Sequence, residues 1–257
     1  MKKLIAAIIA LGAIASVAAS ARAQQPLKAA GQDVPPWVLH DKSSDALSGI
    51  AVDLINAIAK NADLQVQYQA MIFADLIPAV TSGKIDVIAT NMAITPERKE
   101  KVDFSNAIYN PPTETVVVLA SDTTPYRTLA DLKGLLVGAQ KGSIQLALLQ
   151  RTGGFSKIKI YTTEKDAWAA VASGQVRAAV TPGGDTIFSA KHGQLPNLRI
   201  VSSYVSSSAK PRMAFAVQKG NSELLGKINA SLSKLEADGT VKAIFIKYGV
   251  DDWAPPK

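Results

Sequence analysis

One short sequence pattern occurs twice in this chain, and it constrains the fold more than any other feature. Residues 79–90 read AVTSGKIDVIAT, and residues 170–181 read AVASGQVRAAVT. Each copy has small apolar residues typical of a helix end, a glycine (Gly83 or Gly174) suited to a C-cap, and an apolar run that predicts a buried strand. The offset of 91 residues is about the size of a small α/β domain. The repeat predicts two similar α/β lobes; coincidence is the alternative, because this combination of elements is common.

The first copy of the pattern leads into a candidate binding site. Its predicted strand, residues 85–89, ends in Thr90 and Asn91, and a proline-containing turn then leads to Arg98. Ligands of open α/β sheets bind outside the carboxyl ends of the strands. A fixed positive charge beyond two small polar residues suits a carboxylate. Thr181 ends the second copy, so we expect a ligand to lie between the two strand ends.

The first residues are typical of a secretory signal peptide. Lys2 and Lys3 precede an apolar run over residues 4–19, and Ala21-Arg22-Ala23 supplies the small residues of a cleavage site. We expect cleavage after Ala23 and an exported, soluble mature chain over residues 24–257. A membrane anchor is the alternative, but the apolar run is short for a membrane span. No cysteine is present for attachment of a lipid.

Composition narrows the chemistry. The absence of cysteine excludes disulfides and thiolate metal sites, and the two histidines, His40 and His192, lack the spacing of a metal pair. We therefore expect no metal and no cofactor. The net charge of +7 falls to +4 without Lys2, Lys3 and Arg22, and the remaining basic residues are scattered. This pattern gives nucleic-acid binding little support.

Two strongly β-like runs, residues 115–120 and 213–218, join segments in which helices and strands alternate. We expect the chain to cross between lobes at these runs. Lobe one would then contain residues 24–117 and 212–257, and lobe two residues 118–211. Two crossings permit hinge bending without unfolding of either lobe.

A second candidate site feature lies in the middle of the chain. A predicted strand over residues 136–139 is followed by Gly142, by Ser143 and by a helical run from Ile144. Free backbone N–H groups at a helix start attract an anion, and the glycine permits a close approach of a ligand. Simple capping of the helix by Ser143 is the alternative.

Taken together, several motifs resemble the family-3 extracellular solute-binding proteins, the polar amino-acid receptors of ABC importers. They read PPWV from Pro35, GIAVDL from Gly49, SGKIDVIATNMAITPERKEKVDFS from Ser82, DLKGLLVGAQKGS from Asp131, SGQVRAAV from Ser173 and LEADGTVKAIFIKYG from Leu235. The resemblance implies the type II periplasmic binding protein fold, with a mixed sheet flanked by helices in each lobe and two hinge crossings. It also implies a monomer in the periplasm and a permease partner in the inner membrane.

The resemblance also implies roles for individual residues. Arg98 would hold the carboxylate of a small ligand through a bidentate ion pair, with Thr90 and Asn91 beside it. Ser143 would hold the same carboxylate from lobe two. Trp37 would either stack on the ligand or pack in the core.

Several positions depart from the family pattern. Ala93 and Ile144 replace hydroxyl residues, Val34 replaces an aromatic residue, and Pro182 replaces an aspartate that pairs with the ligand ammonium. An ammonium buried without a counter-charge is unfavourable. Asp185 and Glu114 are candidate substitutes. We therefore expect a carboxylate ligand whose amine is absent, modified or held differently.

Two other functions fit the same scaffold. Some exported relatives resemble dehydratases acting on cyclohexadienyl acids, and such an enzyme needs a general acid. The candidates are Glu114, Asp185 and His192, although none has a second titratable residue at a sequence spacing typical of a catalytic pair. A soluble sensory module would share the same pocket. The leading expectation is a receptor without catalytic activity.

Overall fold

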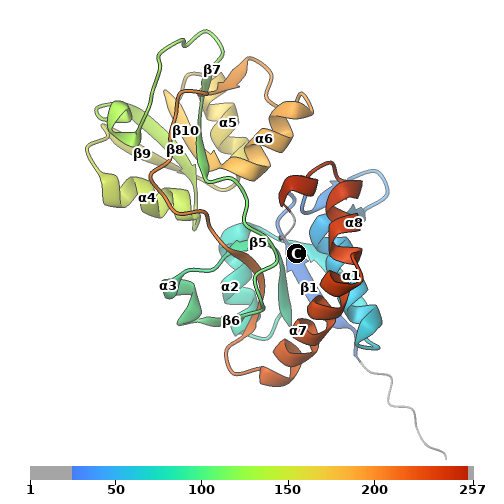
Figure 1. The fold of residues 1–257 in the computed structure, drawn as a ribbon. Coiled ribbons are helices and arrows are strands. Elements are labelled where there is room, and N and C mark those ends of the chain that lie inside the picture. Colours follow the sequence, from blue (N-terminus) through green and yellow to red (C-terminus); the bar gives the residue numbers. More distant parts are fainter. Residues whose placement is uncertain (1–24, 254–257) are drawn as a thin grey trace, which may run out of the picture.

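The structure, a computed structural model, describes residues 25–253 and contains two five-stranded sheets, each flanked by helices. Figure 1 shows one sheet with its helices in each of two lobes, joined by two extended segments of chain. The expected two-lobe α/β fold is therefore confirmed. The predicted signal peptide lies outside the described residues. Within residues 25–253, no helix is long and apolar enough to cross a membrane.

The first lobe combines the two ends of the described chain. Its sheet has the strand order β4-β1-β5-β12-β6, in which β12 is antiparallel to its neighbours. The strands are β1 (Leu27–Gly31), β4 (Val66–Ala70), β5 (Val87–Ala93), β6 (Val102–Phe104) and β12 (Met213–Gln218), with a separate hairpin of β2 (Leu39–Asp41) and β3 (Ala46–Ser48). The helices are α1 (Ile50–Asn61), α2 (Phe73–Thr81), α3 (Pro96–Lys99), α7 (Ser222–Ala237) and α8 (Thr240–Lys247), followed by the 3₁₀ turn η2 (Asp251–Trp253).

The second lobe is formed by the middle of the chain. Its sheet has the order β11-β7-β10-β8-β9. The strands are β7 (Glu114–Leu119), β8 (Leu136–Gln140), β9 (Lys157–Tyr161), β10 (Ala178–Pro182) and β11 (Leu198–Ile200). The helices are α4 (Ile144–Thr152), α5 (Glu164–Ala172) and α6 (Gly183–Lys191), with the 3₁₀ turn η1 (Leu129–Leu132) before β8.

The repeated sequence pattern forms the same local structure in both lobes. The glycines that end α2 and α5, Gly83 and Gly174, both have φ of +74°, a left-handed conformation that favours glycine. The backbone N–H of Lys84 donates to Ala79 O, and that of Gln175 donates to Ala170 O, at 2.9 and 2.8 Å. The following strands, β5 and β10, each lie in the middle of a sheet. The predicted structural equivalence of the two copies is confirmed.

The first crossing lies earlier in the chain than the β-like run suggested. Strand β7 pairs with β10 from Glu114 opposite Pro182 to Val117 opposite Ala179, so the whole strand belongs to the second sheet. The expected boundary between residues 117 and 118 falls inside this strand. We therefore place the crossings at residues 105–113 and 201–212. The pattern identifies a strand, but only the pairing shows which sheet the strand joins.

One local detail also differs from the sequence-based expectation. Strand β5 continues to Ala93, because Met213 of β12 pairs with Ala93, so Thr90 and Asn91 lie within the strand and not at its end. Helix α1 begins at Ile50 after Gly49, and Asp53 lies in its first turn. The Asp53 carboxylate does not cap the helix; it accepts hydrogen bonds from Lys247 and Tyr248.

Candidate functional site

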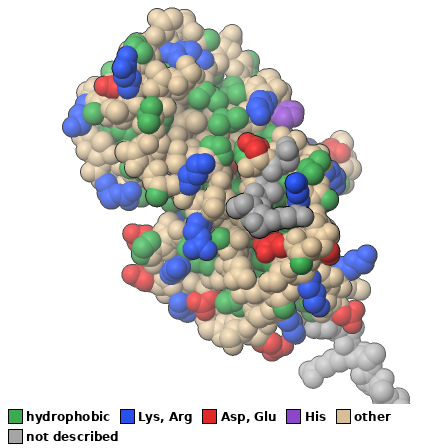
Figure 2. All heavy atoms as spheres, viewed as in Figure 1, with side chains coloured by type: hydrophobic (Ala, Val, Ile, Leu, Met, Phe, Trp, Pro, Cys, Tyr) green, Lys and Arg blue, Asp and Glu red, His purple; other side chains and the backbone are tan. Residues whose placement is uncertain are grey.

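Two cavities lie along the junction of the lobes. The outer cleft has a volume of about 1200 Å³, and α2, α3, α4 and the second crossing contribute to its walls. The inner pocket, of about 30 Å³, is lined by residues of both lobes. Figure 2 shows basic side chains on both sides of the constriction between the lobes. The candidate site therefore has a narrow inner part and a wide outer part.

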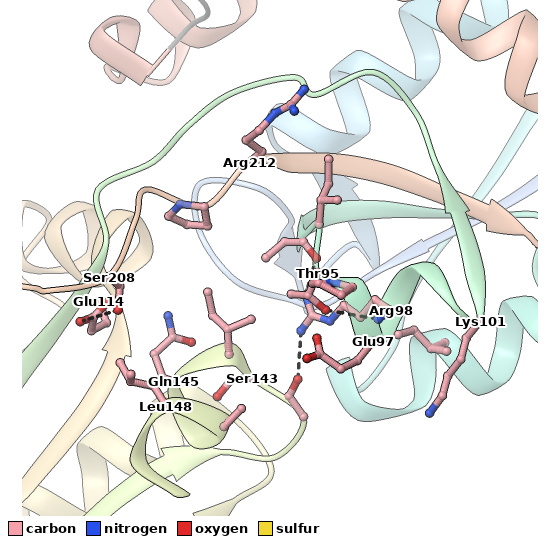
Figure 3. Close-up of a pocket in the computed structure, with 18 of the residues that line it drawn as sticks. Thr95, Glu97, Arg98, Lys101, Glu114, Ser143, Gln145, Leu148, Ser208 and Arg212 are labelled. Atoms are coloured by element: carbon pink, nitrogen blue, oxygen red, sulfur yellow. Dashed lines mark hydrogen bonds between the residues drawn. The ribbon is translucent and has the colours of Figure 1, made fainter. Parts of the chain in front are cut away.

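Arg98 reaches from the first lobe to the second. It lies on α3, a short helix whose N-cap, Thr95, accepts a hydrogen bond from the Arg98 backbone N–H at 3.2 Å. The guanidinium donates from Nη1 to Ala93 O at 2.7 Å and from Nη2 to Gly142 O, in the second lobe, at 3.0 Å. Figure 3 shows Arg98 directed toward the turn before α4, with Ser143 and Gln145 on the facing side. Arg98 thus joins the two walls of the site.

Arg98 is only 9% exposed, and its guanidinium carbon lies 5.4 Å from the centre of the Phe73 ring. Burial lowers the pKa of Arg98 to about 10, with Glu97 opposing that shift. The side chain therefore remains charged at neutral pH. The N–H donors of this buried cation are bonded to backbone carbonyls. A carboxylate can replace one of these carbonyls, because a carboxylate accepts a stronger hydrogen bond from a guanidinium.

Six of the residues predicted for the site line the inner pocket. They are Asn91, Ala93, Arg98, Ser143, Ile144 and Pro182. Sequence analysis missed the remaining members, which are Phe73, Gln140, Gln145, Glu164 and Met213. Four predicted residues line neither cavity: Trp37, Thr90, Thr181 and Asp185.

These four residues have other partners. Trp37 packs in the first core and stacks on Tyr109, with ring centres 4.2 Å apart, so the core alternative fits. The Thr90 hydroxyl donates to Asn91 Oδ1 at 3.1 Å, and the Thr181 hydroxyl lies 2.8 Å from that of Thr186. All of these side chains are buried.

Ser143 has the capping role that its position predicts. It is the N-cap of α4, accepting a hydrogen bond from the Leu146 N–H at 3.0 Å and donating to Gln140 O at 2.8 Å. Ser143 also lines both cavities. The start of α4 therefore faces the site, at the turn whose Gly142 carbonyl meets Arg98.

Asp185 holds the lobes together. It lies on α6 and is 2% exposed, and its two oxygens accept from Trp37 Nε1 and Asn91 Nδ2 of the first lobe, both at 2.6 Å. A further contact between the lobes joins Gln140 Nε2 to Gln32 Oε1 at 2.6 Å. These bonds, with the one from Arg98 to Gly142, hold the structure in a closed arrangement.

Asp185 also forms a buried carboxyl pair with Glu164 of α5. Burial raises the pKa of Asp185 to about 7, although hydrogen bonds from Trp37, Glu164 and Asn91 oppose the shift. Burial, together with the neighbouring Asp185, raises the pKa of Glu164 well above its usual value. Glu164 is 3% exposed, and apart from the bond within this pair its buried Oε2 has no hydrogen-bond partner in the described part of the chain.

The Glu164–Asp185 pair makes stability depend on pH. The folded pair retains protons up to about neutral pH, whereas unfolded carboxyls release them near pH 4, so stability should fall as the pH rises between these values. We expect a loss of about 1.4 kcal/mol per pH unit for each proton retained. Urea unfolding at pH 5, 6 and 7 measures the slope, and Glu164→Gln should reduce it. An equal slope in the variant would contradict this assignment.

The structure does not gather the three candidate acids of a dehydratase. Glu114 lies in the outer cleft, where Oε1 accepts from Tyr204 at 2.8 Å and from Ser206 at 2.6 Å. His192 stacks on Phe188 and lies 2.8 Å from its backbone oxygen. Neither His192 nor Asp185 lines the outer cleft or the inner pocket. The geometry thus offers no shared position for a substrate among the three.

Comparisons with known proteins agree with this geometry. The sequence profile of the family described as bacterial extracellular solute-binding proteins, family 3, matches residues 28–251. The L-arginine-binding protein of Pseudomonas aeruginosa is 31% identical over 234 residues, covering 83% of each chain. A solved structure of an ancestral arginine-binding protein bound to arginine is 34% identical, with a TM-score of 0.78, covering 88% of this chain and 98% of that one. An ancestral amino acid-binding protein, a precursor of cyclohexadienyl dehydratase, is 28% identical, with a TM-score of 0.76 over 87% of this chain and 94% of that one.

Proposed function

Because this chain belongs to family 3 of the bacterial extracellular solute-binding proteins, we propose that it captures an amino acid or a related small carboxylate between its lobes for an ABC importer. The observation that carries the proposal is the position of Arg98. Its charged guanidinium is buried in the inner pocket and donates to a carbonyl of the opposite lobe. A ligand carboxylate placed there would meet both lobes.

Binding would couple to closure through this contact. The inner pocket has the volume of about two water molecules, so an amino acid enters only when the lobes move apart. In the proposed cycle the ligand carboxylate replaces Gly142 O on Arg98, and the start of α4 then closes over it. The ligand binds the closed form more strongly than the open form, which shifts the population toward closure.

The outer cleft would select the ligand side chain by charge. Besides Arg98, its walls contain the basic residues Lys101, Arg151, Lys210 and Arg212, against the acidic residues Glu97 and Glu114. This excess of positive charge disfavours a cationic side chain, although solvent screens the effect. We expect neutral polar or acidic amino acids to bind about tenfold more tightly than lysine or arginine.

Calorimetric titration of the purified protein with the standard L-amino acids and with simple carboxylates tests both parts of the proposal. Binding of any of these compounds supports the carboxylate receptor, and the ranking of side chains tests the charge of the outer cleft. If arginine and lysine bind most tightly, the charge argument is wrong while the receptor assignment stands. If no compound with a carboxylate binds, the assignment itself is wrong.

The dehydratase alternative has less support than the receptor. The relatives described above are binding proteins by name, including the precursor of the dehydratase. The separation of Glu114, His192 and Asp185 also leaves no gathered acid site. Incubation with arogenate or prephenate, followed by assay for an aromatic product, tests this alternative directly.

We further propose an exported monomer that delivers its ligand to a membrane permease. Among the described residues, the exposed large apolar side chains are scattered: Ile72, Ile160, Val205 and Ile246 lie on different elements or loops. Single exposed apolar residues of this kind do not form an association surface. Light scattering tests the monomer, and the N-terminal sequence of the mature protein tests cleavage after Ala23.

A further inference from the structure

We propose that Glu164 receives the α-ammonium group of the ligand, so that the site prefers a zwitterionic amino acid to a carboxylate without an amine. This inference rests on the proposed function and makes its ligand class more specific. It also accounts for recognition of an amine in a pocket where residue 182 is proline.

The position of Glu164 in the inner pocket is the first argument. Glu164 is the first residue of α5 and lines this pocket, as Arg98 does from the opposite lobe. The two side chains, of opposite charge type, thus line one small pocket of about 30 Å³. The ammonium and carboxylate of an α-amino acid are attached to the same carbon, so their partners must line one pocket.

The pairing of Glu164 with Asp185 is the second argument. The two buried carboxyls share a hydrogen bond, and Glu164 Oε2 accepts none from any other group within residues 25–253. Two adjacent carboxyls lack a counter-charge, and a charged N–H donor is a strong partner for a carboxylate. An ammonium that enters the pocket would supply such a donor.

Other carboxylates near the site are already used. Both oxygens of Asp185 accept hydrogen bonds from the first lobe, and Asp185 lines neither cavity. Glu114 lies in the outer cleft and accepts from hydroxyl groups of the second crossing. Among the described residues that line the inner pocket, Glu164 is therefore the acidic one.

Several charged or titratable groups surround Glu164. Asp185 faces it from α6, Lys165 follows it on α5, Arg98 shares the pocket from α3, and Tyr109 adds a buried hydroxyl near Asp185. An ammonium would stabilise the ionised form of the Glu164–Asp185 pair, because opposite charges favour ionisation. Binding should therefore release protons to solvent, more at pH 6 than at pH 8.

Calorimetry on the wild type and on Glu164→Gln tests the inference. The probes are L-glutamine and L-arginine, each paired with the analogue that lacks the α-amine, 4-carbamoylbutanoate or 5-guanidinopentanoate. In the wild type we expect the amino acid of the tighter pair to bind at least about 100-fold more tightly than its analogue. Glu164→Gln should reduce this ratio to below about fivefold, with little change for the analogue, and should abolish the proton release seen in buffers of different ionisation enthalpy.

Glu223→Gln on α7 is the matched control, because Glu223 is exposed and its partner among the described residues is Lys227. It should keep the wild-type ratio. Thermal unfolding checks that Glu164→Gln remains folded, as expected for a replacement of similar shape. The inference is overturned if the wild type binds an analogue as tightly as its amino acid, or if Glu164→Gln keeps the discrimination. Either result leaves the carboxylate receptor intact, whereas failure of all four probes and of the wider panel overturns both proposals.

Discussion

Replacement of Arg98 by methionine is expected to weaken ligand binding by about 100- to 1000-fold, because two charge-assisted hydrogen bonds together contribute about 3–4 kcal/mol. Methionine retains apolar contact with Phe73 but has no donor for a carboxylate or for Gly142 O. Arg98→Lys should recover only part of the loss, since an ammonium has the charge but not the planar pair of donors. Calorimetric titration with the tightest carboxylate of the panel measures each change.

Lys99→Met is the control for this experiment. Lys99 follows Arg98 on α3, is exposed, and lines neither cavity. The substitution removes the same charge from the same helix, so the overall electrostatic effect is matched. Unchanged affinity in Lys99→Met with a large loss in Arg98→Met supports direct contact. Equal losses in the two variants would instead indicate an effect of net charge alone.

Gly183→Ala is expected to destabilise the protein by about 3 kcal/mol or more, because the new Cβ would overlap backbone atoms that cannot rotate away. Gly183 begins α6, and a Cβ built on it lies 1.8 Å from the carbonyl oxygen of Thr113, in the first crossing. The overlap would push α6 away from the crossing. Thermal unfolding should show a fall in Tm of about 10 °C for a chain of this size.

The same substitution at Gly226 should have the opposite sign. Gly226 lies inside α7, and a Cβ built there meets no atom within 4 Å. Alanine loses less conformational entropy than glycine in a helix interior, so Gly226→Ala should stabilise the fold by about 0.5–1 kcal/mol. If Gly183→Ala proves as well tolerated as Gly226→Ala, the close contact between α6 and the first crossing is not rigid.

Features fixed by neighbouring residues could be predicted from the sequence. The left-handed turns at Gly83 and Gly174 and the cap at Ser143 depend on local backbone preferences. The position of Arg98 could also be predicted from the sequence, because its short helix α3 follows soon after β5. These features suffice to predict the two-lobe fold and half of the binding site.

Features that depend on distant pairing could not be predicted in this way. The extension of β5 through Thr90 and Asn91 depends on β12, which is more than a hundred residues away in the chain. Asp185 meets its partners, Trp37 and Asn91, across the junction of the lobes. Glu164 gave no local sign of its burial, because a carboxylate in the first turn of a capped helix is usually exposed to solvent. The capping box at the start of α5 therefore gave no indication that Glu164 lines the pocket.

The strand order determines which sheet can fold first as the chain emerges from the ribosome or from a translocation pore. Within residues 25–253, the strands of the second sheet lie between residues 114 and 200, whereas β6 of the first sheet has β12, which begins at Met213, as its one partner. The middle segment can thus finish its sheet while the earlier segment still has unpaired edges on β5 and β6. Until the last fifty residues arrive, these open edges are the part of the nascent chain most exposed to aggregation and most in need of a chaperone.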